Sequence, residues 1–139
     1  SGFDEADIAR AAKEYLTPLS SYQLSDFLNG RLIFAFRDEE RIFEQNYSLL
    51  SFSEPSNVIL SAFKKAEHSD GYVVRVFNPY LRKDATARIT YGGSAHYELV
   101  SLDERSKGET LVASASEGAQ LPELQHCKLL TVLVTPEIK

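Results

Sequence analysis

The chain has 139 residues, which is enough for one domain with a hydrophobic core. Its 15 Lys and Arg residues against 20 Asp and Glu residues give a formal net charge of −5, the opposite of the balance expected for a nucleic-acid-binding protein. A hydrophobic content of 43% and a charged content of 25% are ordinary for globular proteins and exclude an intrinsically disordered chain.

The first predicted element is a helix near the N-terminus. Apolar residues recur there with the spacing of one helical face, at Ile8, Ala11, Ala12, Tyr15 and Leu16. Asp4 or Asp7 can cap the free amides at the start, and Pro18 ends the helix near Leu16. Residues 1–29 are therefore predicted to form a helix and a connection.

Residues 30–139 are predicted to form an antiparallel β-sandwich of about eight strands, so the fold class is mainly β with a short N-terminal helix. Short β-like runs alternate there with turn signals, and no strand–helix alternation indicates a parallel sheet. The predicted strands are Arg31–Arg37, Arg41–Leu50, Val58–Glu67, Tyr72–Phe77, Ala85–Tyr91, Tyr97–Leu102, Thr110–Ser114 and Leu129–Thr135. Ser106-Lys107-Gly108 and Glu117-Gly118 are among the predicted turns.

The two strongest runs, Val58–Phe63 and Tyr72–Phe77, are separated by Ser69-Asp70-Gly71. Asp-Gly readily supplies the positive φ angles of a tight primed turn, so the two runs are predicted to form a hairpin.

Both faces of the Tyr72–Phe77 strand carry large apolar groups. An antiparallel strand with one solvated face alternates apolar and polar residues, so this strand is expected to be covered on both sides. The second cover has to come from a further layer or from another domain. The run Leu129–Val134 has the same character.

Two polar residues of this region, Lys64 and Arg75, are candidates for an interdomain interface. Arg75 lies between Val74 and Val76, where a covered guanidinium needs a carboxylate or carbonyl partner. One interpretation is a structural ion pair with Glu67 or Glu104; another is that Arg75 and Lys64 reach across a domain boundary. Asn78-Pro79 also suits a simple turn.

No metal site and no catalytic site are predicted. His68, His96, His126 and Cys127 lack the paired spacing of a structural zinc site. The acidic pairs Glu39-Glu40 and Asp103-Glu104 lie beside turns, where solvated charge explains them. Neither a nucleophile elbow nor a glycine-rich phosphate loop occurs.

A sugar-binding platform is an alternative interpretation, since four tyrosines lie in or near turns. Tyrosine rings at such positions can stack on sugars, although packing within the sheet is their commoner role. They are Tyr22, Tyr80, Tyr91 and Tyr97.

Residues 57–67 and 70–79 read Asn-Val-Ile-Leu-Ser-Ala-Phe-Lys-Lys-Ala-Glu and Asp-Gly-Tyr-Val-Val-Arg-Val-Phe-Asn-Pro. This pair of strings resembles the C-terminal β-domain of glycoside hydrolase family 38, the α-mannosidases and mannosylglycerate hydrolases. Residues 12–19, residues 99–104 and the closing Leu129–Pro136 are similar to further family segments. The resemblance implies a retaining exo-glycosidase that cuts α-mannosides, with its zinc ion and aspartate nucleophile in a separate catalytic domain.

The resemblance therefore predicts a non-catalytic domain that supports the catalytic and helical domains of one parent chain, with Lys64, Arg75 and Asn78 as candidates for the interdomain interface or the substrate rim. The domain is expected to need no cofactor of its own and to meet an α-mannoside only through the parent chain. A homo-oligomer is a further alternative for its assembly. The alternative is an independent carbohydrate-binding or protein-interaction module. The third hypothesis is a hydrolase in its own right.

Three features lead to expectations about the chain's context. No run of 18 apolar residues and no leader-like start occur, so we expect no membrane partner. Cys127 is the single cysteine and cannot form an internal disulfide, which favours the cytoplasm. The absence of methionine suggests a piece of a longer protein.

Overall fold

The computed structural model describes residues 4–21, 47–53, 57–114 and 118–137. Its elements are α1 (Glu5–Leu16), β1 (Leu50–Phe52), β2 (Ile59–Lys65), β3 (Tyr72–Phe77), β4 (Arg88–Tyr91), β5 (Ala95–Val100), β6 (Ser106–Thr110), β7 (Ala113–Ser114), β8 (Gly118–Gln120) and β9 (Leu129–Pro136). Within these residues, no helix has the length and apolarity needed to cross a membrane.

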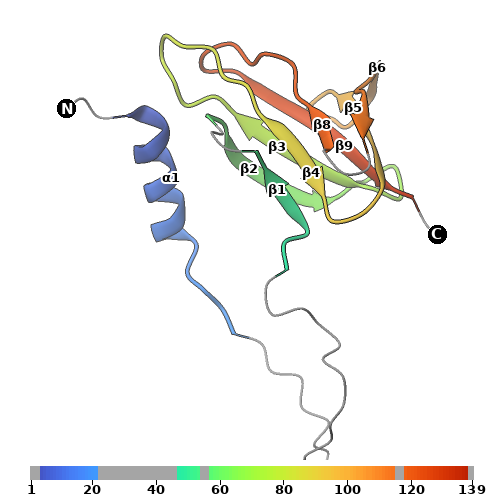
Figure 1. The fold of residues 1–139 in the computed structure, drawn as a ribbon, viewed down its shortest axis with the longest axis horizontal. Coiled ribbons are helices and arrows are strands. Elements are labelled where there is room, and N and C mark those ends of the chain that lie inside the picture. Colours follow the sequence, from blue (N-terminus) through green and yellow to red (C-terminus); the bar gives the residue numbers. More distant parts are fainter. Residues whose placement is uncertain (1–3, 22–46, 54–56, 115–117, 138–139) are drawn as a thin grey trace, which may run out of the picture.

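The strands form two antiparallel sheets that face each other, which confirms the predicted sandwich (Figure 1). In the described part of the chain, one sheet has four strands in the order β1-β4-β8-β7, and the other has five in the order β2-β3-β9-β5-β6. β1 and β2 are therefore edge strands, and they lie on the side of the sandwich where α1 stands (Figure 1).

The core lies between the sheets. It is built mainly from valine, leucine, isoleucine and alanine side chains that alternate toward the interior. Val74 and Val76 of β3 meet Ile89 of β4 and Val132 of β9 there, all nearly without solvent contact. The β-branched side chains fit this pleated, two-layered interior well.

The strand predictions were right for the apolar runs and wrong at two polar places. β2, β3 and β9 match their predicted runs closely, whereas Ala85 makes only an isolated bridge to Leu124 before β4 begins. The predicted turn Ser106-Lys107-Gly108 lies within strand β6, and Gly118 of the predicted turn Glu117-Gly118 is the first residue of β8, whereas Glu117 lies outside the described residues. The predicted strand Arg31–Arg37 and residues 41–46 of the predicted strand Arg41–Leu50 lie outside the described residues, and of residues 47–50 only Leu50 belongs to a strand, β1.

The predicted hairpin of β2 and β3 is confirmed, but its primed turn is wrong. Lys65 pairs with Tyr72, and the Ala66 N–H donates to the Gly71 carbonyl at 2.9 Å, so the loop is longer than a two-residue turn. Gly71 has no positive φ. A Cβ there would lie 2.8 Å from the Val134 carbonyl oxygen, so close approach of β9 explains this glycine.

The helix has the predicted start and end. Asp4 is the N-cap, and its Oδ1 accepts from the Ala6 N–H at 2.9 Å; the helix ends at Leu16, just before Pro18. Its orientation is the unexpected feature. Only Ala6 is buried, whereas Ile8, Tyr15 and Leu16 of the apolar face are 53%, 88% and 76% exposed. The apolar face therefore points away from the sandwich.

The outer face of β3 is covered from within the chain. Val73 lies on the face opposite Val74 and Val76, yet it is 0% exposed. The segment 101–105 folds over this face, and its Leu102 carbonyl accepts a hydrogen bond from Arg75. The sequence left two sources for this second cover, a further layer or another domain. Over Val73, the cover comes from this chain itself.

Candidate functional site

The three candidate residues lie along the hairpin of β2 and β3 and the loop that follows it. Lys64 is near the end of β2, Arg75 lies within β3, and Asn78 directly follows β3. Lys64 and Arg75 line one hollow of about 340 Å³, whereas Asn78 does not line it. The structure thus brings two of the three together.

Lys64 is bound by two carboxylates. Its Nζ lies 2.7 Å from Glu67 Oε1 and 2.5 Å from Glu104 Oε1. The hydrogen bonds that Lys64 donates, first to Glu104 and then to Glu67, raise the pKa of its ammonium above the ordinary value. Lys64 is therefore a cation held in place by the chain's own acids.

Glu104 is the centre of this cluster. Its side chain is only 7% exposed, and its Oε2 accepts from the Glu67 N–H at 2.8 Å. This backbone hydrogen bond, together with Lys64, holds the pKa of the Glu104 carboxyl below its ordinary value. Glu104 also has a φ of 65°, which is uncommon for a residue with a side chain.

Arg75 is held by neutral partners. Its Nη2 donates to the Leu102 carbonyl at 3.1 Å and its Nε to Thr131 Oγ1 at 3.3 Å. The carbonyl partner was predicted, but the alternative ion pair with Glu67 or Glu104 is wrong, because Lys64 occupies both carboxylates. The guanidinium therefore fixes the 101–105 loop on the outer face of the sheet.

Asn78 is an internal residue with 1% exposure. Its Nδ2 donates to the Lys83 and Leu124 carbonyls, both at 2.8 Å, and its Oδ1 accepts from the Tyr80 N–H at 2.9 Å. A buried amide with all of these partners organises the loop between β3 and β4. The turn interpretation of Asn78-Pro79 fits this position.

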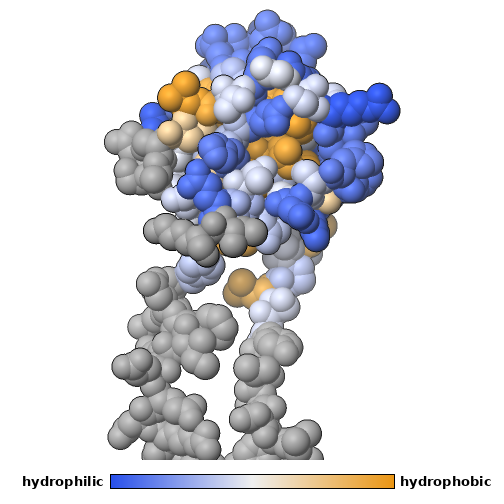
Figure 2. Space-filling model, turned by 90° about the vertical axis from the view of Figure 1, so that its right-hand side faces the viewer, coloured by the Kyte–Doolittle hydropathy of each residue, from blue (hydrophilic) through white to orange (hydrophobic). Residues whose placement is uncertain are grey.

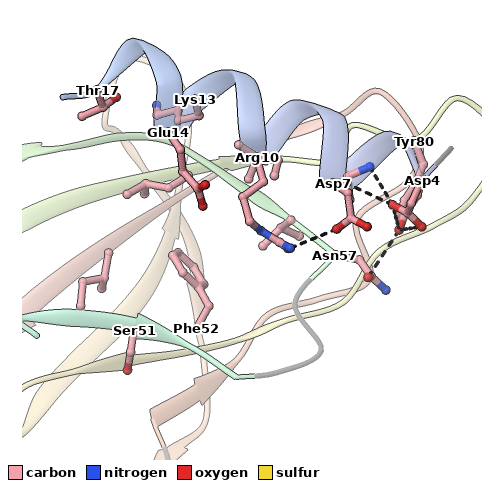
Figure 3. A pocket seen from close by; sticks show the side chains of 15 residues that line it. Asp4, Asp7, Arg10, Lys13, Glu14, Thr17, Ser51, Phe52, Asn57 and Tyr80 are labelled. Atoms are coloured by element: carbon pink, nitrogen blue, oxygen red, sulfur yellow. Dashed lines mark hydrogen bonds and ion pairs between the residues drawn. The ribbon is translucent and has the colours of Figure 1, made fainter. Parts of the chain in front are cut away.

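A second and larger hollow, of about 740 Å³, lies between α1 and the edge formed by β1 and β2 (Figure 3). Sequence reasoning missed it, because it arises from the inverted orientation of the helix. The polar face of α1 forms one wall, with Asp7, Arg10, Lys13 and Glu14, and the strands form the other. Lys13 Nζ reaches across to the Ser61 carbonyl at 3.3 Å.

One end of this cleft is closed by Asp4 and Tyr80. The Tyr80 hydroxyl donates to Asp4 Oδ1 at 3.0 Å, and it lies 3.5 Å from Asn57 Oδ1 (Figure 3). Burial acts to raise the pKa of Asp4, but hydrogen bonds from Tyr80 and from the Ala6 and Asp7 N–H groups outweigh it, so this pKa is lowered. Burial, followed by the bond to Asp4, raises the pKa of Tyr80. This contact attaches the helix to the sandwich.

The remaining sequence candidates do not assemble into a site. Within the described ranges, no three His, Cys, Asp or Glu side chains come together as a metal site requires. His96 lies 3.1 Å from Glu137, and His126 lies 3.6 Å from Asp84, so each of these histidines meets a different carboxylate. Tyr80 and Tyr97 are buried, so they form no exposed sugar-binding platform, and Tyr22 lies outside the described residues.

Residues 57–132 match the family described as glycosyl hydrolases family 38 C-terminal beta sandwich domain. The matched segment is more than half of the chain and runs from just before β2 into β9, so it contains the hollow around Lys64 and Arg75. No curated protein and no solved structure gives a significant match.

Proposed function

Because the chain belongs to the C-terminal β-sandwich domains of glycosyl hydrolase family 38, we propose that it is a non-catalytic domain of an α-mannosidase. The parent would hydrolyse α-mannosides with retention, and this domain would support the catalytic domain. The matched segment supports the proposal because it contains both strands of the β2–β3 hairpin and the first half of β9, which belong to one sheet of the sandwich.

The exposed apolar face of α1 carries the proposal. Amphipathic helices normally bury this face, and here Ile8, Tyr15 and Leu16 lie in solvent while charged residues face the sandwich. The face of the sandwich that Figure 2 shows is mainly hydrophilic, with a few separate hydrophobic spots. A neighbouring domain of the parent chain would cover the helix and remove its apolar side chains from water.

Lys64 and Arg75 are the residues we assign to the boundary with the catalytic domain. Both line the open hollow beside the 101–105 loop, where Arg105 and Asp103 add exposed charges. Asn78 has almost no exposed surface, so its contribution to a rim would be indirect, through the loop between β3 and β4.

The zinc ion and the aspartate nucleophile that the family implies belong, in this proposal, to the parent's catalytic domain. The described residues do not fit such a metal site, because the histidines are dispersed and paired singly with Glu137 and Asp84. We also place the parent in the cytoplasm, in keeping with the single, unpaired Cys127.

Hydrolysis of a nitrophenyl α-mannoside tests the proposal. The purified chain is expected to show no turnover even at high concentration, whereas the parent is expected to lose activity or stability when the sandwich is deleted. Turnover by the isolated chain would identify it as a hydrolase. Undiminished activity and stability of the deleted parent, with glycan binding by the isolated chain, would favour the independent carbohydrate-binding module.

A further inference from the structure

The cleft between α1 and the sandwich runs along the edge of β1 that lies opposite β4, and this edge pairs with no other strand of the described residues. Consecutive residues of a strand point to opposite faces of a sheet, so a hollow over one face would touch every second residue. Leu50, Ser51 and Phe52 all line the cleft, and β1 is the edge strand of its sheet. The cleft therefore opens onto the strand edge, where unpaired backbone groups lie.

The hydrogen bonds to β4 show which backbone groups of β1 are directed there. The Gly92 N–H donates to the Leu49 carbonyl and the Ser53 N–H to the Arg88 carbonyl, both at 2.9 Å. In an antiparallel pair, residues that bond to the partner alternate with residues that do not. Leu50 and Phe52 therefore direct their backbone groups away from β4 and toward the cleft, although Ser48 Oγ already donates to the Leu50 carbonyl at 2.7 Å.

The two long walls of the cleft differ in chemistry. Leu50, Phe52 and Leu60 form an apolar floor that is continuous with the core. On the helix side, Arg10 contacts Asp7 at 3.2 Å and Lys13 reaches the Ser61 carbonyl, whereas the Glu14 carboxylate points into the cleft (Figure 3). An acidic group thus faces an apolar floor across a free strand edge.

We propose that this cleft binds an extended peptide segment that adds as a strand to β1. The segment would alternate apolar side chains, directed to the Leu50–Phe52–Leu60 floor, with basic side chains directed to Glu14. Strand addition to a free edge uses backbone hydrogen bonds for affinity and alternate side chains for specificity. The proposal concerns the inward face of α1 and does not depend on the supporting role proposed above.

Titration of the isotope-labelled 139-residue chain with a synthetic blocked peptide of alternating lysine and valine tests this inference by NMR. A length of about seven residues suits an ordinary strand. We expect saturable shifts and slower hydrogen exchange at the Leu50 and Phe52 amides. N-methylation of all valines or of all lysines provides the matched controls, because only one of the two sets can face β1. The peptide whose methylated residues face β1 should not bind, and the other methylated peptide should bind like the unmethylated one.

Two protein variants test the charge argument. Glu14→Lys should weaken peptide binding about tenfold, the loss of one favourable charge contact. Glu109→Lys, which changes an exposed residue of β6 outside the cleft, should leave the affinity unchanged. The amide spectrum of each variant shows directly that it is folded.

Several results would overturn the inference. The first is that about 1 mM peptide causes no saturable chemical-shift change. The second is that the valine-methylated and the lysine-methylated peptides lose binding equally, and the third is that the shifts are confined to the outward face of α1. Saturable shifts at Leu50 and Phe52 with methyl α-mannoside but not with the peptide would identify a saccharide cleft. Self-association that protects the same amides would identify a second copy as the occupant.

Discussion

At the scale of single residues, Glu104 joins two parts of the chain that are far apart in sequence. Its carboxylate binds the Glu67 N–H at the tip of the β2–β3 hairpin and Lys64 at the end of β2. Glu104 has a left-handed backbone conformation, and such strained conformations persist only where surrounding contacts fix them. We therefore regard Glu104 as the anchor of the 101–105 loop.

Replacing Glu104 by Gln is expected to lower the thermal unfolding temperature at neutral pH, because the ion pair with Lys64 is lost. The lowered folded-state pKa means that this carboxylate stabilises the protein above its ordinary pKa of 4.5 and loses that effect as the pH falls through the folded-state value. The difference between wild type and Glu104→Gln should thus shrink on acidification. Urea unfolding between about pH 7 and about pH 3 measures it.

Glu109→Gln is the matched control, since Glu109 lies exposed on β6. Its unfolding midpoint should match that of the wild type throughout the same pH range. A difference between wild type and Glu104→Gln that stays constant down to the lowest pH would show that Glu104 does not stabilise the fold through its charge.

Asn78→Ala is expected to lower the free energy of unfolding by about 3 kcal/mol, because each buried polar group left without a partner costs about 1–3 kcal/mol. The carbonyl of Lys83 and the N–H of Tyr80 would lose these partners, and the Leu124 carbonyl would keep only the Ala85 N–H. Chemical unfolding gives the value, with the exposed Arg82→Ala as control. A loss below about 1 kcal/mol would mean that water replaces the amide.

At the scale of elements, β8 exists because a glycine lets it approach β4. Gly118 has a φ of 72°, and a Cβ there would lie 2.0 Å from the Ile89 carbonyl oxygen. Gly108 has a similar φ of 74°, but a Cβ added to it would meet nothing within 4 Å. The two glycines therefore separate the cost of a left-handed conformation from the cost of a backbone clash.

Gly108→Ala should cost about 1–2 kcal/mol, the ordinary penalty of the left-handed conformation. Gly118→Ala should cost clearly more, because β8 has to move away from β4 as well. Comparison of the two unfolding free energies by urea titration tests this. Equal values would indicate that β8 shifts freely and contributes little to the sheet.

We expect substitutions on the exposed apolar face of α1 to leave the unfolding temperature of the isolated chain unchanged. Tyr15→Gln and Leu16→Gln together should leave the unfolding temperature of the isolated chain within experimental error, because neither side chain packs against the described part of the sandwich. Asp4→Ala should instead lower it, because it removes the N-cap, worth about 1 kcal/mol, and the contact with Tyr80. Destabilisation by the double variant would show that the helix packs through its apolar face.

The elements that the sequence predicted are those defined by their own apolar pattern. The runs Val-Val-Arg-Val of β3 and Leu-Leu-Thr-Val-Leu-Val of β9 predict strands that are covered on both faces. This prediction needs no knowledge of the strands that pair with them. β6 consists of exposed polar residues, and β8 reads Gly-Ala-Gln, so both are strands only because a neighbour pairs with them. Likewise, the amphipathic pattern predicted α1, but it could not indicate which face meets the sandwich.

The candidate site was predictable only in part, for a similar reason. The position of Arg75 between two valines indicated that it needs a partner, and the carbonyl of Leu102 supplies it. The sequence could not show that Lys64 takes both nearby acids, since that depends on the 101–105 loop folding back over β3. The cleft along β1 had no local signal at all, because its walls come from separate elements.

At the scale of the whole molecule, the two sheets enclose one hydrophobic core, while apolar side chains of α1 lie outside it in solvent. Buried side chains from both sheets form one cluster, which supports an independently folding body. The apolar face of α1 is one of the apolar surfaces that the described residues leave in solvent. This contrast is what a supporting domain needs, since it has to fold by itself and still offer a surface to its neighbour.

Calorimetric titration of the 139-residue chain with the separately produced remainder of the proposed parent enzyme tests the proposed support role most directly. We predict saturable binding that the Tyr15→Gln, Leu16→Gln double variant abolishes while it keeps the wild-type fold. Undiminished binding by the double variant, or no binding by the wild-type chain, would contradict a domain that docks through the outward face of α1.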